Sequence, residues 1–204
     1  MSLPHALLAL LDAGPMTGYE LTKQFDQSAD RVWHATHPQI YTELRRLEGA
    51  GLVTAREMPR GPKAKAVKRA YALTEEGGAE LRRWVAQVEA PQRVRDVAYL
   101  KATYYEYAEP ETVREQFEAH RAHFHEQQQR WERHVEQLRA RRTELLSRRL
   151  AGAAREDHEK IVAFKVHAYQ GLIERARTEV AWAERGLALV AGLDEPPDPA
   201  ASAE

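Results

Sequence analysis

The chain has 204 residues, of which 43% are hydrophobic and 30% are charged, and its formal net charge is −1. This length predicts one or two domains, and the near-zero net charge excludes a protein that binds nucleic acid through a basic surface all over the molecule. The absence of cysteine excludes disulfides and thiolate metal sites. There is no apolar run of membrane-spanning length and no signal-peptide pattern, so we expect a cytoplasmic protein with no membrane partner.

The charge is unevenly distributed along the chain. Between Arg31 and Leu73 there are nine basic and three acidic residues, a net charge of +6, so the remainder of the chain carries −7. A local concentration of positive charge is the kind that favours contact with nucleic acid.

Two short helices are predicted at the N-terminus. Residues 3–13 form an apolar helix that ends at Gly14 and Pro15. The second helix covers residues 17–28, and Thr17 with Glu20 gives it a capping box.

The third predicted helix covers residues 36–47 and is the most informative stretch of the sequence. Thr36 and Gln39 form a second capping box, and a proline in the first turn costs no hydrogen bond. An apolar stripe holds one face of this helix (Ile40, Leu44 and Leu47), while the other face carries Thr42, Arg45 and Arg46. A helix held by one face, with hydroxyls and guanidiniums on the other, is typical of one that enters a DNA major groove.

A two-stranded hairpin follows, with strands at residues 52–58 and 67–73 and a basic tip at residues 59–65. A fourth helix begins after Thr74, and its predicted apolar stripe consists of Leu81, Trp84, Val85 and Val88. Three helices, a basic hairpin and one further helix define a winged helix-turn-helix over residues 1–90, in which the hairpin is the wing.

Several runs in this region resemble the PadR family of bacterial transcription regulators. They are His5–Leu11, Thr17–Leu21, Gln39–Glu48, Gly51–Val53 and Tyr71–Gly77. The resemblance implies a homodimer that binds operator DNA and usually represses, and that a small molecule or stress releases in many members. It also implies a helical C-terminal dimerisation domain, similar to that of virulence-activator PadR proteins.

The same resemblance implies which side chains contact DNA. Carried over to this sequence, these are the tyrosines of the second and third helices, polar residues of the third helix, and basic residues of the wing. They are Tyr19, His37, Gln39, Tyr41, Thr42, Arg45, Arg60, Lys63, Lys65 and Lys68. The wing tip is longer than the tight run of many relatives and is diluted with alanine.

The C-terminal half is predicted to be entirely helical, as a dimerisation and effector domain over residues 91–193 with a disordered tail at 194–204. We expect helices at residues 95–107, 111–150 and 159–191. In the second of these, aromatic or leucine side chains recur every seven residues, at Phe117, Phe124, Trp131, Leu138 and Leu145, which indicates packing against another long helix. The predicted stripe of the last helix is Ile161, Phe164, Ala168, Leu172, Val180, Ala183 and Leu187.

These long helices carry more apolar surface than one antiparallel pair covers, so we expect them to pair with a second subunit. A two-fold dimer sets two third helices about one DNA turn, roughly 34 Å, or a multiple of it apart, so the operator is expected to be pseudo-palindromic. Aromatic residues that could line an effector pocket between the domains are Trp33, His34, Tyr104, Tyr105, Phe117, Phe124, Trp131 and Tyr169. The spacing of His120 and His123 would also suit a metal, but helix or interface histidines are the simpler interpretation, and we assign no metal site.

The sequence therefore predicts a mainly α protein, with an N-terminal winged helix-turn-helix and an all-helical C-terminal dimerisation domain. Its predicted function is that of a homodimeric DNA-binding repressor relieved by a small aromatic or hydrophobic effector. It contains no recognisable enzyme motif and no cofactor-binding motif. Two alternatives stay open: a helical metal- or ligand-binding sensor whose winged domain mediates protein contacts, and an accessory module of an enzyme.

Overall fold

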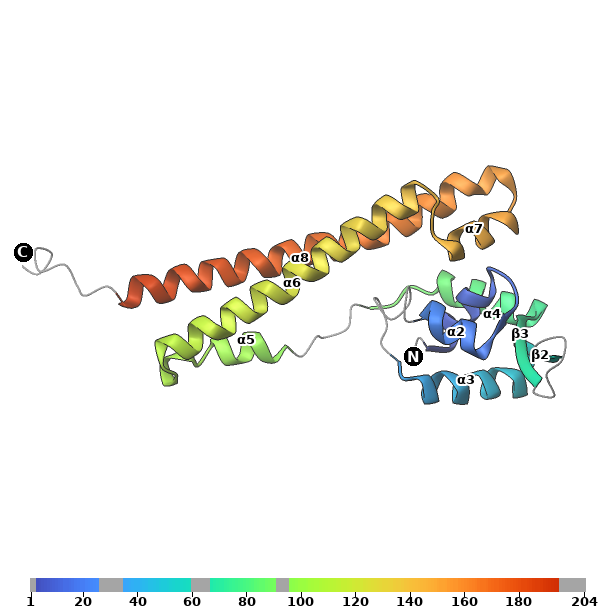
Figure 1. The fold of residues 1–204 in the computed structure, drawn as a ribbon, viewed down its shortest axis with the longest axis horizontal. Helices are drawn as coiled ribbons and strands as arrows, with labels where there is room; N and C mark the ends of the chain where they lie inside the picture. Colours follow the sequence, from blue (N-terminus) through green and yellow to red (C-terminus); the bar gives the residue numbers. More distant parts are fainter. Residues whose placement is uncertain (1–2, 26–34, 60–66, 91–95, 195–204) are drawn as a thin grey trace, which may run out of the picture. The chain divides into compact units, whose positions relative to one another are not determined.

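The computed structural model describes residues 3–25, 35–59, 67–90 and 96–194 (Figure 1). The chain divides into two compact units, of which the first combines Met1–Ala90 with Arg141–Glu159 and the second combines Pro91–Ala140 with Lys160–Glu204. Within the described residues, no helix is both long and apolar enough to cross a membrane.

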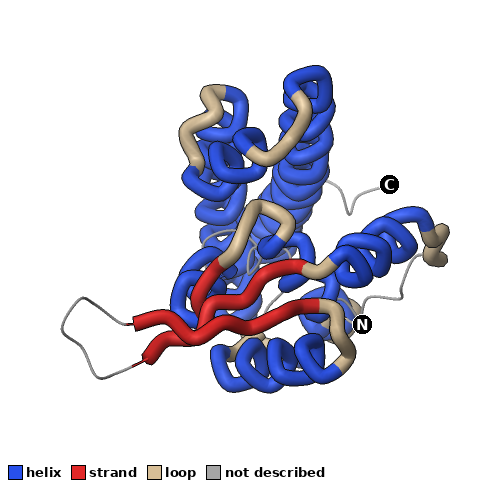
Figure 2. The backbone as a smooth tube through the Cα atoms, turned by 90° about the vertical axis from the view of Figure 1, so that its right-hand side faces the viewer, coloured by secondary structure: helices blue, strands red, loops and turns tan. Residues whose placement is uncertain are grey.

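The first unit is a winged helix-turn-helix. Its elements are α1 (Leu3–Leu11), β1 (Met16–Thr17), α2 (Gly18–Gln24), α3 (His37–Gly49), β2 (Val53–Pro59), β3 (Val67–Leu73), α4 (Glu75–Ala86), α7 (Glu144–Ala151) and the 3₁₀ turn η3 (Arg155–Asp157). The sheet has three antiparallel strands in the order β1-β3-β2, which lie side by side in Figure 2. The hairpin of the wing was predicted, but the short β1 was not.

The core of this unit is formed where α1, α2, α3 and the sheet meet. The predicted stripe of α3 is fully buried, with Ile40, Leu44 and Leu47 all at 0% exposure. Both predicted capping boxes are present, at Thr17–Glu20 and Thr36–Gln39. Because α3 is fixed along one face and at its N-terminus, its other face can remain in solvent without loosening the helix.

Helix α4 is only partly attached by its predicted stripe. Leu81 packs against the core, and the ring of Trp84 stacks on His5 at 4.6 Å between centroids. Val85 and Val88, however, are exposed, so the prediction is wrong for them. For Val88 the reason is that α4 ends at Ala86, which leaves this residue beyond the helix.

The predicted helix over residues 111–150 is wrong, because it consists of two separate helices. Helix α6 covers Pro110–Arg139, and after it Arg141 has a φ of 55°. This left-handed conformation ends a helix in the manner usually provided by glycine, and because residue 141 is an arginine, the end of the helix could not be predicted from the sequence. Helix α7 then packs on the first unit, with Leu146 1% exposed and Arg149 paired with Asp12 at 2.8 Å.

The second unit is an antiparallel helical hairpin. Its elements are α5 (Val97–Ala102), the 3₁₀ turn η2 (Tyr105–Tyr107), α6, and α8 (His158–Asp194) from Lys160 onward. The predicted helix at 95–107 is therefore interrupted. Helices α6 and α8 run side by side in Figure 1, and their rings meet at Phe117–Trp182 and His134–Tyr169, with centroids 5.2 and 4.5 Å apart.

The predicted stripe of α8 is confirmed only in part, because four of its residues are half-buried and one of these, Leu187, packs against the hairpin core. Of its seven residues only Ala183 is buried, whereas Phe164 is 66% exposed. The side chains that contact the hairpin core include Val162, Val166 and Ile173. Apolar residues occur on both faces of this helix, so its periodicity did not identify which face packs on α6. Residues 195–204 of the predicted tail lie outside the described residues.

Candidate nucleic-acid interface

The outward face of α3 presents side chains that the sequence predicted for DNA contact. Tyr41, Thr42 and Arg45 are exposed on it, and His37 is exposed in its first turn. The neighbouring Arg46 instead donates to Glu43 at 2.7 Å. Arg45 is therefore better placed than Arg46 to offer its guanidinium to a ligand.

Gln39 has a structural task in addition to its predicted role. Its amide oxygen accepts a hydrogen bond from the backbone N–H of Thr36 at 2.9 Å and one from the Thr36 hydroxyl at 3.1 Å. The cap therefore uses the amide oxygen, and the NH₂ group is the part of this exposed side chain that can donate to a base or a phosphate.

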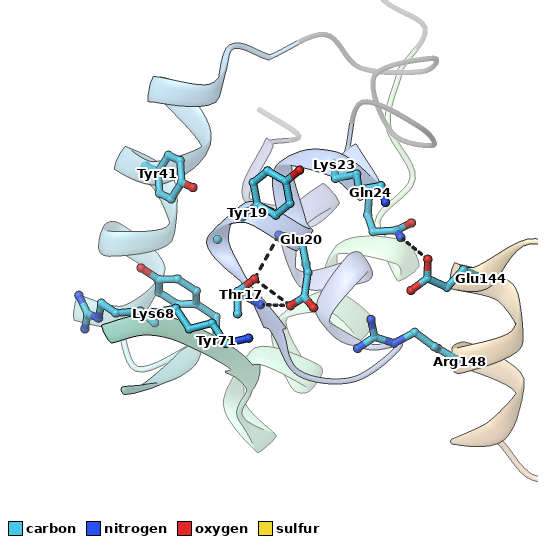
Figure 3. Close-up of a pocket in the computed structure, with 12 residues that line it drawn as sticks. Thr17, Tyr19, Glu20, Lys23, Gln24, Tyr41, Lys68, Tyr71, Glu144 and Arg148 are labelled. Atoms are coloured by element: carbon cyan, nitrogen blue, oxygen red, sulfur yellow. Dashed lines mark hydrogen bonds between the residues drawn. The ribbon is translucent and has the colours of Figure 1, made fainter. Parts of the chain in front are cut away.

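A groove of about 710 Å³ lies between α2, α3, β3 and α7 (Figure 3). Tyr19, which is 74% exposed, and Tyr41, which is 41% exposed, both line it. Gly18 permits this arrangement, because a Cβ atom added to it would lie 2.5 Å from Cε1 of Tyr41. The two predicted tyrosines thus come from different helices but meet at one groove.

The same groove is rich in positive charge. Its lining includes four basic side chains, Lys23, Lys68, Arg69 and Arg148, and two acidic ones, Glu20 and Glu144. Glu144 accepts a hydrogen bond from Gln24. A groove with excess positive charge and three phenols, those of Tyr19, Tyr41 and Tyr71, has the donors that bind phosphate oxygens.

Glu20 is held in its capping role by three hydrogen bonds with Thr17. The backbone N–H and the hydroxyl of Thr17 lower the pKa of this carboxyl below its ordinary value. The carboxylate therefore stays charged, but it points into the helix cap. Its main effect is to fix the start of α2, and with it Tyr19.

Several residues that line the groove were not predicted from the sequence as DNA contacts. Lys23 follows Tyr19 by four residues on α2, and Arg69 lies two residues before Tyr71 on β3, so helix and strand periodicity could have found both. Arg69 is also fixed by a 2.7 Å ion pair with Glu48. Arg148 had no sequence signal, because it reaches the groove only through the unexpected packing of α7.

The structure places the wing residues only in part. Lys68 is exposed on β3 and lines the groove. Arg60, Lys63 and Lys65 lie outside the described residues, and so do Trp33 and His34 of the predicted effector pocket.

The remaining predicted effector residues do not share one cavity. Tyr105 and Phe117 line a cavity in the second unit, and Tyr104 is exposed nearby in sequence. Phe124 packs against His120, while Trp131 and Tyr169 are buried elsewhere in the hairpin. The aromatic residues predicted to line one effector pocket therefore belong to different parts of the structure.

The histidines are engaged with other side chains. His120 is 3.1 Å from Glu179, and His123 contacts Gln127. Among the residues that the structure describes, no group of three or more histidine or carboxylate side chains is arranged to hold a metal ion.

The first unit thus defines a winged helix-turn-helix protein with a positively charged groove beside its third helix. Residues 7–83 match the family model of the transcriptional regulator PadR-like family. The negative transcriptional regulator PadR of Bacillus subtilis (strain 168) is 38% identical over 101 residues, which is 49% of this chain and 54% of that protein. The chain therefore spans about half the length of this curated relative.

Solved structures extend the similarity of fold to both units. Bacillus subtilis PadR in complex with operator DNA has a TM-score of 0.71 and 26% identity, covering 93% of this chain and 99% of that one. Bacillus subtilis PadR in complex with p-coumaric acid has a TM-score of 0.59 and 25% identity, and the match covers 94% of this chain and 99% of that one.

Proposed function

We propose that this protein is a homodimeric, sequence-specific DNA-binding repressor of transcription whose operator binding is relieved by a small-molecule effector. The observation that carries this proposal is the surface around α3. There Thr42 and Arg45 project from a helix whose opposite face is wholly buried, beside the positively charged groove.

In the proposed mechanism, different side chains supply affinity and specificity. The lysines and arginines of the groove contact phosphates, which is a sequence-independent and salt-dependent contribution. Arg45, Thr42 and the NH₂ group of Gln39 contact base edges in the major groove, where an arginine can donate two hydrogen bonds to guanine. Tyr19 and Tyr41 donate to the phosphate backbone and set the depth of α3.

The apolar surface of α8 supports the dimer. Phe164, Leu189 and Leu193 are 63–75% exposed although they lie on a helix that already buries another face against α6. A second copy of the hairpin would cover such side chains, and two-fold symmetry would bring two copies of α3 to one face of the DNA. We assign dimerisation and effector binding to residues 91–140 and 160–193, and DNA binding to residues 1–90 together with residues 141–159, which carry α7.

The effector part of the proposal is supported by a relative. Bacillus subtilis PadR has been solved both with operator DNA and with p-coumaric acid. An effector can release this protein from DNA only by binding better to an arrangement of the dimer that does not fit the operator.

The test is the affinity for DNA taken from upstream of the protein's own gene, measured by fluorescence anisotropy at several salt concentrations. We expect the affinity to fall steeply with salt, with each phosphate contact contributing about 0.9 to the logarithmic slope. Arg45→Ala should lower the affinity for this DNA about tenfold or more, since a bidentate base contact is worth about 1–3 kcal/mol.

Arg82→Ala is the matched control, because Arg82 is an exposed arginine on α4. It should bind DNA like the wild type. If the affinity does not depend on salt, or if both variants bind equally, the winged domain does not bind DNA in this way. The alternative of a sensor whose winged domain contacts proteins would then be favoured.

A further inference from the structure

Gln39 lies in the first turn of α3, and its side chain is exposed. In helix-turn-helix proteins the N-terminal residues of the recognition helix contact base edges. Thr42 follows Gln39 by three residues, so the two side chains are neighbours on the helix surface. Gln39 is therefore placed to contact a base, and the chemistry of its amide determines which base it can bind.

The amide oxygen of Gln39 is fully used by the helix cap. It accepts one hydrogen bond from the backbone N–H of Thr36 and a second from the Thr36 hydroxyl, at 2.9 and 3.1 Å. A carbonyl oxygen has two lone pairs, so these two bonds leave no acceptor free. The backbone N–H also fixes the orientation of the amide, because the NH₂ group of a flipped amide could not accept a hydrogen bond from it.

The NH₂ group of the same amide carries two donors. Within the described part of the chain, it has no hydrogen-bond partner. A glutamine that binds adenine donates to N7 and accepts from the N6 amino group. Gln39 cannot form this pair while its oxygen remains in the cap, so it acts on DNA as a donor only.

The four bases differ in what they offer to a side chain that only donates. In the major groove guanine presents two neighbouring acceptors, N7 and O6, whereas adenine presents the acceptor N7 beside the N6 donor. Thymine presents one acceptor next to a methyl group, and cytosine presents only a donor. Guanine is therefore the best match, since the amino group of adenine would face the NH₂ donors of Gln39.

We propose that Gln39 selects guanine over adenine at one position of each operator half-site, because the helix cap occupies its amide oxygen. To pair with adenine, the amide would have to leave the cap, and the start of α3 would lose both hydrogen bonds with Thr36. Thr36 is thus a positioning residue that acts on DNA through Gln39. The inference deepens the proposed function and rests on it, since it requires α3 to enter the major groove.

The experiment begins with selection from a pool of random DNA duplexes by the full-length protein, followed by sequencing of the bound DNA. Comparison with Gln39→Ala identifies the position that Gln39 contacts, because only there should the variant lose its base preference. We expect the wild type to select guanine at this position. A duplex with adenine there should bind about tenfold more weakly, as is typical for loss of a specific base contact.

A base analogue tests whether Gln39 contacts the guanine itself. 7-Deazaguanine forms the same base pair but lacks the N7 acceptor. In fluorescence anisotropy this analogue should weaken binding by the wild type about threefold to tenfold, which corresponds to the loss of one hydrogen bond. It should not weaken binding by Gln39→Ala, since a contact that is already absent cannot be lost again.

Thr36 provides the test of the cap. Thr36→Val removes the hydroxyl that donates to Gln39, and valine fits the extended backbone of this residue, with a φ of −78° and a ψ of 153°. One lone pair of the amide oxygen is then free to accept from adenine, so the preference for guanine should fall about threefold to tenfold. Thr36→Ser keeps the hydroxyl and is the matched control. The ratio of the two affinities is the readout, because a less stable helix weakens binding to both duplexes equally.

Three results would overturn the inference. They are selection of adenine at the position that Gln39 contacts, equal weakening of wild type and Gln39→Ala by 7-deazaguanine, and an unchanged guanine preference in Thr36→Val. The first two do not depend on the folding of Thr36→Val. If Arg45→Ala weakens binding to the selected DNA but Gln39→Ala changes no base preference, the inference is wrong while the proposed DNA-binding function stands. If no sequence is selected, the proposed function is wrong as well.

Discussion

Gly18 allows a direct test of the DNA interface, because the position of the Tyr41 ring depends on the absence of a side chain at residue 18. In Gly18→Ala the new Cβ would lie 2.5 Å from Cε1 of Tyr41, whereas carbon atoms pack at about 3.5–4.0 Å. The Tyr41 ring must therefore move by about 1 Å or more. Since the ring is 41% exposed, it can turn into solvent, and the fold should lose little stability.

A displacement of this size is large compared with the tolerance of a hydrogen bond, whose donor–acceptor distance varies over only about 0.5 Å. The hydroxyl of Tyr41 should then lose its contact with DNA. One such bond is worth about 0.5–1.5 kcal/mol. We therefore expect Gly18→Ala to weaken DNA binding about threefold to tenfold for each half-site, and Tyr41→Phe to have a similar effect.

The assay is fluorescence anisotropy with the upstream DNA, accompanied by urea unfolding to confirm that the fold is intact. Gly49→Ala is the control, because Gly49 lies on α3 and nothing is within 4 Å of a Cβ atom built there. It should bind DNA like the wild type. If Gly18→Ala binds normally while Tyr41→Phe binds weakly, the ring does not need the space that Gly18 leaves, and the reasoning is wrong.

Three further predictions concern stability. Leu146→Ala should destabilise the first unit by about 2–5 kcal/mol in urea unfolding, because this α7 side chain is 1% exposed; an unchanged unfolding midpoint would mean that α7 is not docked. Gly186→Ala should cost about 1–3 kcal/mol by overpacking against the Phe117 ring, whereas Gly192→Ala, with open space, should cost nothing; equal midpoints would contradict the packing of α6 on α8. Hydrogen bonds from Thr17 lower the pKa of Glu20 below its ordinary 4.5, so the stability that its charged form provides is present above 4.5 and is lost as the pH falls through the folded-state pKa. The difference in unfolding free energy between wild type and Glu20→Gln should therefore shrink on acidification below 4.5, and a difference that grows would contradict the cap.

Much of the first unit was predictable because local signals agreed with the tertiary structure. The capping boxes at Thr17 and Thr36 are complete within four residues, and the α3 stripe has only one face to bury. Strand β1 was missed because two residues form it, and only the pairing of Met16 with Tyr71 makes them a strand. No periodicity can be read from two residues.

The second unit was predicted less well because its helices are apolar on more than one side. The sequence of α8 contains two stripes about one residue apart, and only contact with α6 decides that Ile173 rather than Leu172 is fully buried. The end of α6 was missed for a different reason. Arg141 adopts a left-handed conformation without the glycine that usually marks one, so the heptad pattern appeared to continue to Leu145.

The exposed polar residues of the candidate DNA site could be predicted from the sequence, but which of them meet at one groove could not. Tyr19 and Tyr41 were singled out separately, and the role of Gly18 between them depends on distances that no motif contains. Arg148 reaches the groove because α7 packs against residues that are far from it in the sequence.

The packing of α7 also has a consequence for biosynthesis. Arg149 pairs with Asp12, so the first compact unit needs chain segments that are made at different times. At about 5–20 residues per second, the ribosome takes several seconds to proceed from the end of α4 to the end of α7. During that interval the nascent winged domain lacks the helix that covers part of its core. A fragment cut after Ala90 would have the same defect permanently, so an isolated DNA-binding domain should be made by joining residues 141–159 to it through a designed linker.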